Sequence, residues 1–483
     1  MSLSTALHGA LSGLSAAGRA SGVVSENIAN ALTPGYAKRS IILSSNSEVS
    51  PGVRVLGIQR QANPGIISSR RQADAEFSNA NPLASFQTRF ASAVGDPTDT
   101  DSITARLAAF DSSLISASSR PDSAQRLDDV AIKANDLVNL INNASDTVQK
   151  MRSEADRKIS IQVERLNKAL SDVEDLNVRI TALEAGNAPT AALLDQRQVL
   201  IDEINNIAPV NVVERNYGQV ALYTIGGAVL LDGQAATLEF TPVNTIVPEM
   251  TLTSGGLSGL TLNGNPIRTD SLRGALRGGS LSAQFEIRDE LGVEAQAELD
   301  SVARDLIERF EDPALDPTLS PGDPGLFTDN GNAFDPLTEI GLSARLRVNP
   351  DADPEQGGES WRLRDGLGAA APGPSGDARF LQSLQSVLET ARVPGSGNFG
   401  TGALTASEIS GALVSSAAQA EAVSDQRLVF SSASLTEMKN AELSQGVDSD
   451  EELSQLILIE QAYAANARML QVVDELMETL LRL

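Results

Sequence analysis

The sequence predicts a mainly α-helical, multidomain chain with an inserted β domain (an α+β class). Three observations predict this class. Both ends carry apolar residues at alternating steps of four and three, a longer stretch after Pro121 holds the same rhythm, and residues 209–275 change to β-branched runs separated by turns. We therefore expect terminal helices that form coiled-coil-like pairs, a long helical rod domain and a small outer β domain.

The first helix is expected over residues 1–32. Its seam consists of Leu3, Leu7, Ala10, Leu14, Ala17, Ser21, Val24, Ile28 and Ala31. Glycines interrupt it, and each costs ~1 kcal/mol relative to alanine in a helix interior, so this helix needs another element to pack against. The run Thr33-Pro34-Gly35 ends it, because proline cannot continue the helix and glycine allows the turn.

The last helix shows the same pattern at the other end of the chain. Its apolar positions are Leu453, Leu456, Tyr463, Ala467, Leu470, Val473, Met477 and Leu480. The acidic residues from Asp448 to Glu452 suit its first turn, where the helix dipole favours negative charge.

Between the ends, the chain reads as a sequence of regular elements. Short β-type runs at 40–43 and 53–58, joined through Pro51-Gly52, predict a hairpin or extended arm. Helical patterns follow at 66–92 and up to Ser118, the second capped by Asp99 or Asp101. The longest helix is expected from Pro121 to the break at 186–189, and a further helix covers 190–206.

The β pattern begins at Pro209. Strands are expected at 210–213, 220–225, 229–231, 237–241, 250–252 and 260–262, with turns at Asp232-Gly233 and Asn263-Gly264. Helix resumes from 280 to 310, residues 311–375 predict long loops, and the last third is helical with breaks at 394–402 and 445–448.

These patterns divide the chain into three predicted domains. Residues 1–36 with 446–483 form a terminal helical assembly domain. Residues 37–208 with 276–445 form a helical rod domain, which includes a β arm at 38–67 and a loop-rich stretch at 311–375. Residues 209–275 form the inserted β domain.

Composition argues against several functions. Lys+Arg 37 against Asp+Glu 63 gives a net charge of −26, which offers no electrostatic reason to bind nucleic acid or an anionic membrane. The chain has no cysteine and a single histidine, His8, in the N-terminal helix. Disulfides, thiolate metal sites and a Ser/His/Asp triad away from His8 are therefore absent from the sequence. The N-terminus lacks the features of a secretory signal peptide.

Two motifs resemble ligand sites but lack other features that such sites require. Gly395-Ser-Gly-Asn-Phe-Gly400 matches a dinucleotide fingerprint without the preceding strand, so a surface linker is the better interpretation. Asp351, Asp353 and Glu355 alternate like a calcium loop, but Gln356 and Arg362 occupy positions that need glycine and glutamate. We therefore expect no enzyme activity, no cofactor and no metal.

Both ends resemble bacterial flagellar axial proteins, the family of rod, hook and hook-associated proteins. The stretches that carry this resemblance are Asn27-Ile-Ala-Asn-Ala-Leu-Thr-Pro-Gly-Tyr36, Gly446–Leu453, Gln461–Ala467 and Glu475–Leu481. The middle is similar to the hook-associated members at the hook–filament junction, through Gly52–Arg60, Leu193-Leu-Asp-Gln-Arg197 and Gly279-Ser-Leu281. One departure is Asn63, where the family usually has an acidic residue.

The resemblance implies a structural subunit of the extracellular flagellum that joins hook to filament. It implies type III export in an unfolded form and assembly through the terminal helices. The implied partners are hook protein, hook-associated protein 3, other copies of the chain and an export chaperone. The expected assembly interface consists of Leu3, Leu7, Leu14, Val24, Ile28, Asn30, Gly35, Tyr36, Leu453, Leu456, Tyr463, Leu470, Val473, Met477 and Leu480.

Three alternatives stay open. A hook or distal rod protein would share both ends but is disfavoured by the long helix at 120–205. A secreted, rod-associated cell-wall hydrolase would need an acid/base pair in a cleft. An unrelated coiled-coil adhesin would leave the two terminal stretches unexplained.

Overall fold

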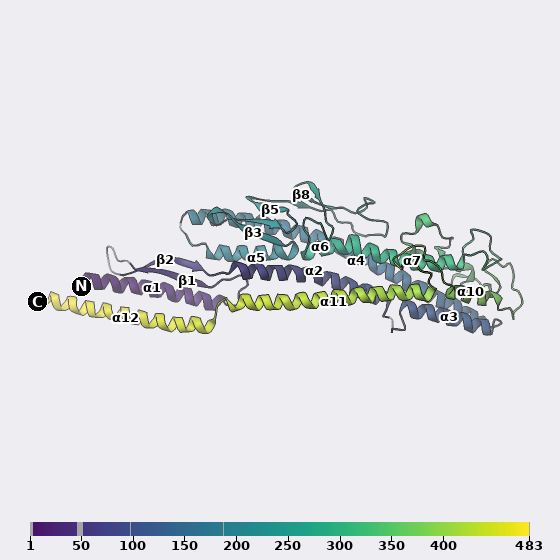
Figure 1. Cartoon of the computed structure of the whole chain (residues 1–483). Coiled ribbons are helices and arrows are strands. Elements are labelled where there is room, and N and C mark those ends of the chain that lie inside the picture. Colours follow the sequence, from purple (N-terminus) through teal and green to yellow (C-terminus); the bar gives the residue numbers. More distant parts are fainter. Residues whose placement is uncertain (1–2, 46–51, 97, 187, 483) are drawn as a thin grey trace.

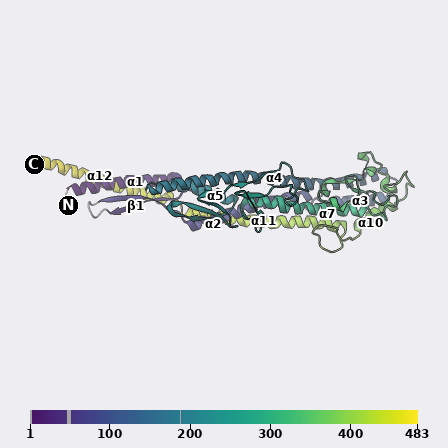
Figure 2. The same cartoon turned by 90° about the horizontal axis from the view of Figure 1, so that it is seen from above.

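The computed structural model describes residues 3–45, 52–96, 98–186 and 188–482 of the chain. These residues form an elongated, mostly helical molecule with both termini at the same end (Figures 1 and 2). The predicted class, mainly α with an inserted β region, is confirmed. Pro51 and Asn187, which lie in predicted turns, fall outside the described residues.

At the narrow end, α1 (Leu3–Asn30) and α12 (Ser449–Leu481) lie side by side and antiparallel (Figure 1). The predicted hairpin is present as β1 (Arg39–Ser45) and β2 (Val53–Arg60), which pair antiparallel and lie against α1. The two ends of the chain therefore meet in one slender unit.

A second helix pair follows along the axis. Helix α2 (Pro64–Val94) packs against α11 (Ala406–Ser444), as Figure 1 shows. The Asn63 carboxamide caps α2 by accepting from the Gly65 and Ile66 N–H groups, and it donates to Gln445. The Asn63 side chain therefore links the start of α2 to the end of α11.

The long predicted helix is confirmed as α4 (Ala124–Ala185), which at 1.5 Å per residue spans about 93 Å. It is preceded by α3 (Ile103–Ser119) and followed by α5 (Ala191–Ile207). The predicted cap of α3 was wrong. Ser102, not Asp99 or Asp101, accepts from the Ala105 N–H group, because its hydroxyl stands immediately before the first helical turn.

The helix expected from 280 to 310 is confirmed, but its middle is a π-helical turn. It comprises α6 (Gly279–Glu286), a π-helical turn (Ile287–Leu291) and α7 (Gly292–Phe310). The π turn surrounds buried Arg288, whose guanidinium bonds to Asp156 of α4 at 2.7 Å. The spacing of apolar residues does not reveal the π turn, because the turn adds one residue to the helix without breaking the apolar pattern.

The β insert packs on α4. Its first sheet has the order β3 (Val210–Glu214), β4 (Val220–Thr224), β5 (Val229–Asp232) and β6 (Gln234–Ala235); its second has β7 (Leu238–Glu239), β8 (Leu260–Leu262) and β9 (Asn265–Ile267), all antiparallel. The strand expected at 250–252 is a turn instead. The Thr251 and Ser254 side chains bond to nearby backbone there, which competes with strand pairing.

The loop-rich stretch carries short elements. They are β10 (Phe327–Asp329), α8 (Leu342–Arg345), β11 (Leu346–Val348) and α9 (Arg362–Asp365), and α10 (Arg379–Glu389) follows this stretch. Short 3₁₀ turns lie at Asn216–Gly218, Pro336–Thr338, Pro350–Ala352 and Pro354–Gln356. Strands β10 and β11 pair antiparallel.

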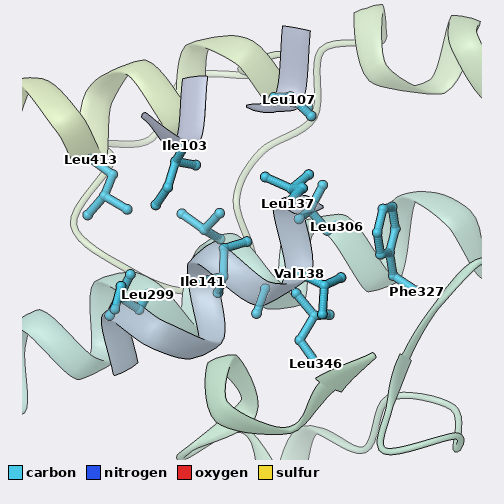
Figure 3. Packing of buried hydrophobic residues seen from close by; sticks show 14 of the residues in the cluster. Ile103, Leu107, Leu137, Val138, Ile141, Leu299, Leu306, Phe327, Leu346 and Leu413 are labelled. Carbon is cyan, nitrogen blue, oxygen red and sulfur yellow. The ribbon is translucent and has the colours of Figure 1, made fainter. Parts of the chain in front are cut away.

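The main apolar core lies at the broad end of the molecule. Figure 3 shows Ile103 and Leu107 of α3 facing Leu137 and Ile141 of α4, with side chains of α7, α11, β10 and β11 closing around them. A second core joins the other half of α4 to α5 and the β insert. Helix α4 is therefore covered by its own chain along nearly its whole length.

Candidate assembly surface

The contact between α1 and α12 places the predicted interface residues in three environments. Val24 and Val473 are buried. Residues that are half-buried are Leu3, Leu7, Leu14, Ile28, Asn30, Gly35, Tyr36, Leu456 and Leu470. Residues that stay exposed are Leu453, Tyr463, Met477 and Leu480. The helix pair thus brings together only part of the predicted set.

The seam is narrow because it is lined by small residues. Ala10, Ala16, Ala17 and Val23 of α1 are buried. Opposite Gly13, a Cβ atom would stand 2.7 Å from the Asn466 carboxamide, so the glycine is what lets this side chain approach. Gly18 and Gly22, by contrast, have open space around them.

A buried polar junction closes the base of the seam. Asn27 is 1% exposed, and its Nδ2 donates to Glu452 Oε2 at 2.9 Å. Lys38 adds an ion pair to each of two α12 carboxylates, Glu452 at 3.0 Å and Glu451 at 2.9 Å. Burial opposes the charge of Lys38, but these contacts prevail and raise the pKa of its ammonium. The junction ties α1, β1 and α12 together.

Three predicted residues flank this junction. The Tyr36 hydroxyl donates to Asn27 Oδ1 at 2.8 Å, and burial raises the pKa of this phenol. Asn30 donates back to the Glu26 carbonyl within α1. Gly35 adopts φ +77°, and a Cβ there would stand 2.5 Å from Val199 of α5, so the turn requires glycine.

The motif Leu193–Arg197 connects this end to the rod. The Asp195 carboxylate pairs with Arg39 at 3.0 Å and with Arg60 at 2.7 Å, one from each strand of the hairpin. Arg197 donates to Asn177 Oδ1 and to the Gly218 carbonyl, and burial lowers its pKa to about 10. One turn of α5 therefore holds both the hairpin and the first β sheet.

Helix α12 carries a second apolar seam that nothing in the described chain covers. It lies away from α1 and consists of Leu458, Ala462, Ala465, Met469, Val472, Leu476 and Leu480. The steps alternate between four and three residues up to Leu476, as in a coiled coil. Leu458 is 62% exposed and Leu476 is 49% exposed. Such a stripe on a protein surface marks an interaction site.

The hairpin offers a second uncovered apolar surface at the same end of the molecule. Ile42, Leu43, Val53, Leu56 and Ile58 are all more than one-third exposed. An isolated two-stranded ribbon is marginally stable in water. Both surfaces therefore have the character of contacts that are completed by another molecule.

The two motifs that resemble calcium and dinucleotide sites make hydrogen bonds within the fold. Asp353 accepts from Asn135 and from the backbone N–H of Glu355. In the glycine-rich linker, the Ser396 carbonyl accepts from Ser301.

Within the described ranges, no helix has the length and apolarity needed to cross a bilayer.

Sequence reasoning missed Asn27, Lys38 and Glu452. Asn27 lies inside the stretch that carries the terminal resemblance, so a signal was present. Glu452 was interpreted only as a first-turn acid. Its partner Asn27 is 425 residues away in the chain, and no local pattern reports such a contact.

Two known families match this chain, one in its middle and one at residues 443–483. Residues 443–483 match the family described as flagellar basal body rod FlgEFG protein C-terminal. This match covers helix α12, which pairs with α1. Residues 89–314 match the family described as flagellar hook-associated protein FlgK helical domain. The chain is therefore similar to flagellar hook-associated protein 1 in its helical middle and to flagellar rod proteins at residues 443–483.

Several proteins named flagellar hook-associated protein 1 are similar in sequence to this chain. Flagellar hook-associated protein 1 of Salmonella typhimurium is 27% identical over 286 residues, covering 53% of this chain and 51% of the relative. The Escherichia coli K12 protein is 25% identical over 286 residues, covering 53% and 52%. The chain thus spans about half the length of these relatives. The Bacillus subtilis protein is 23% identical over 501 residues, covering 96% of this chain and 95% of the relative.

A solved structure of the flagellar hook junction protein FlgK from Burkholderia pseudomallei is also similar. It has a TM-score of 0.44 and 19% sequence identity, and the match covers 56% of this chain and 47% of that chain.

Proposed function

We propose that this chain is a structural subunit that joins the hook to the filament of the bacterial flagellum. In this proposal it is exported unfolded, has no enzymatic role, and takes its place outside the cell through its terminal helices. The observation that carries the proposal is the uncovered seam of α12 from Leu458 to Leu480, which lies beside an α1–α12 contact that is already formed. A helix with two apolar seams is suited to pack between two neighbours.

The partners follow from the same surfaces. Other copies of the chain would cover the second seam of α12 and the outer face of the hairpin. Hook protein on one side and hook-associated protein 3 on the other would bind the ends of this layer, and an export chaperone would hold α12 beforehand. In this scheme residues 1–36 with 446–483 act as the assembly domain, residues 37–208 with 276–445 as the rod, and residues 209–275 as the outward-facing β domain.

Deletion of the gene in its own bacterium tests the proposal. Electron microscopy should show finished hooks without filaments, with flagellin lost to the medium, and the intact gene should restore filaments. Missing hooks would instead assign the chain to the hook or distal rod. A clear band in a peptidoglycan zymogram of the purified chain would favour a cell-wall hydrolase.

A further inference from the structure

We infer that Asn27 and Glu452 are positioning residues that set the register in which α1 and α12 pair. The importance of this register for assembly rests on the proposed function. The register itself is a property of the isolated chain and can be measured without a flagellum.

The first argument is that Asn27 is fully used by one arrangement. Its Nδ2 donates to Glu452 Oε2 and to the Arg39 carbonyl, both at 2.9 Å. Its Oδ1 accepts from the Tyr36 hydroxyl at 2.8 Å and from the Arg39 N–H at 2.9 Å. A buried amide that loses such partners has a desolvation penalty of about 1–3 kcal/mol. Only the observed alignment of α12 supplies the Glu452 oxygen.

The second argument is the burial of Glu452. Its side chain has no exposed surface, and its ion-pair partner is Lys38 at 3.0 Å. A buried carboxylate without a counter-charge is strongly destabilising. Any shift of α12 along α1 would move Glu452 away from both Lys38 and Asn27.

The third argument is that a separate contact reports the same register. Gly13 faces Asn466, and Asn27 faces Glu452. Gly13 precedes Asn27 by fourteen residues, and Asn466 follows Glu452 by fourteen residues, so both contacts belong to one antiparallel alignment two heptads apart. A slip of one heptad would put Gly13 opposite Ile459 and Glu452 opposite Ala20.

The apolar seam does not discriminate between these alignments. The buried apolar residues of α1 are small and recur at heptad spacing, as at Ala10, Ala17 and Val24. In helix pairs, a single buried polar residue can fix the register that apolar positions leave open. The polar junction at Asn27 therefore carries the specificity.

Disulfide trapping in the full chain tests this directly, because the chain contains no cysteine. The pair Gly13→Cys with Asn466→Cys reports the observed register. The pair Gly13→Cys with Ile459→Cys reports the one-heptad slip. We expect the first pair to cross-link at least about tenfold faster, which corresponds to ~1.4 kcal/mol.

In the Asn27→Leu background this preference should fall to within about twofold. Ser25→Leu is the matched control, because Ser25 is exposed on α1 and should leave the preference intact. Glu452→Gln is a milder second variant, which keeps the acceptor for Asn27 but removes the charge that pairs with Lys38. We expect it to lower the preference by a smaller factor.

Two results would overturn the inference: equal cross-linking of the two pairs in the parent chain, or an unchanged preference in both Asn27→Leu and Glu452→Gln. If the register preference holds but deletion of the gene leaves filaments normal, the proposed function fails and the register inference stands.

Discussion

The long helix α4 and the terminal helix α12 share one kind of sequence pattern but have different surroundings. Along α4, apolar heptad positions such as Ile141, Ile159 and Val173 have no exposed surface. Along α12, Val473 is buried, whereas most large apolar residues, including Leu458 and Leu476, are about half exposed.

The difference shows where each helix obtains its stability. Helix α4 is enclosed by α3, α7 and the β insert of its own chain. Helix α12 contacts α1 on one face and leaves a second apolar seam open. The same heptad pattern thus serves folding in one region and, by our proposal, assembly in the other. Substitutions in the two regions should separate these roles.

The largest expected effect is at the buried ion pair of the rod. Asp156→Ala would remove one of the two carboxylates that pair with the fully buried guanidinium of Arg288, at 2.7 Å, and leave Asp289 at 2.8 Å. We expect a loss of about 3–5 kcal/mol in unfolding free energy, measured by denaturant titration. Glu164→Ala, exposed on the same helix, should change stability by less than ~0.5 kcal/mol. Equal effects would contradict the account.

A matched pair of apolar truncations compares the two helices directly. Ile141→Ala in the core should cost about 2–5 kcal/mol. Leu458→Ala on α12 should change the stability of the isolated chain by less than ~0.5 kcal/mol, since the side chain is already 62% exposed. A large destabilisation by Leu458→Ala would mean that the second seam is covered within the chain itself.

The ion pairs that join α5 to the β1–β2 hairpin should have a smaller and local effect. Asp195→Ala removes the carboxylate shared by Arg39 and Arg60. We expect faster proteolysis within residues 37–63, with a global loss of about 1–3 kcal/mol at most. Asp172→Ala breaks an exposed ion pair with Lys168 and is the control that should leave the cleavage rate unchanged.

The smallest effect concerns pH. Burial, together with nearby Glu290, raises the pKa of the Glu286 carboxyl. The folded chain therefore binds this proton more tightly than the unfolded chain. Its contribution to stability falls as pH rises from the usual carboxyl range through the raised value, and stays low at pH 7.

Glu286→Gln should accordingly raise the melting temperature at pH 7 and make little difference below about pH 4, where the carboxyl is protonated in both states. Glu164→Gln, at an exposed position of α4 away from Glu286, is the control. A lower melting temperature of Glu286→Gln at pH 7 would show that the charged form is stabilised instead.

Much of the fold could be predicted from the sequence. Apolar periodicity located α1, α4 and α12, and turn residues such as Asp232-Gly233 located the β insert. The errors have local physical causes. A serine hydroxyl caps α3 in place of a nearby carboxylate, and side-chain bonds at Thr251 and Ser254 make a turn where a strand was expected.

The candidate surface was predicted less completely. Periodicity identified Val24 and Val473, and both lie buried in the helix pair. Periodicity alone could not tell which of two apolar seams on α12 faces α1. The polar junction depends on Asn27, Lys38 and Glu452, which meet only after the two ends of the chain come together.

The most direct test of the central claim is a charge placed on the open seam of α12. The deletion strain is complemented with a chain carrying Met469→Glu and Leu476→Glu, and filaments are counted by electron microscopy. Glu460→Gln with Glu475→Gln, at exposed polar positions of the same helix, is the control. We predict stable, exported chains and hooks without filaments for the first variant, and filaments for the control. Normal filaments on the first variant would contradict assembly through this seam.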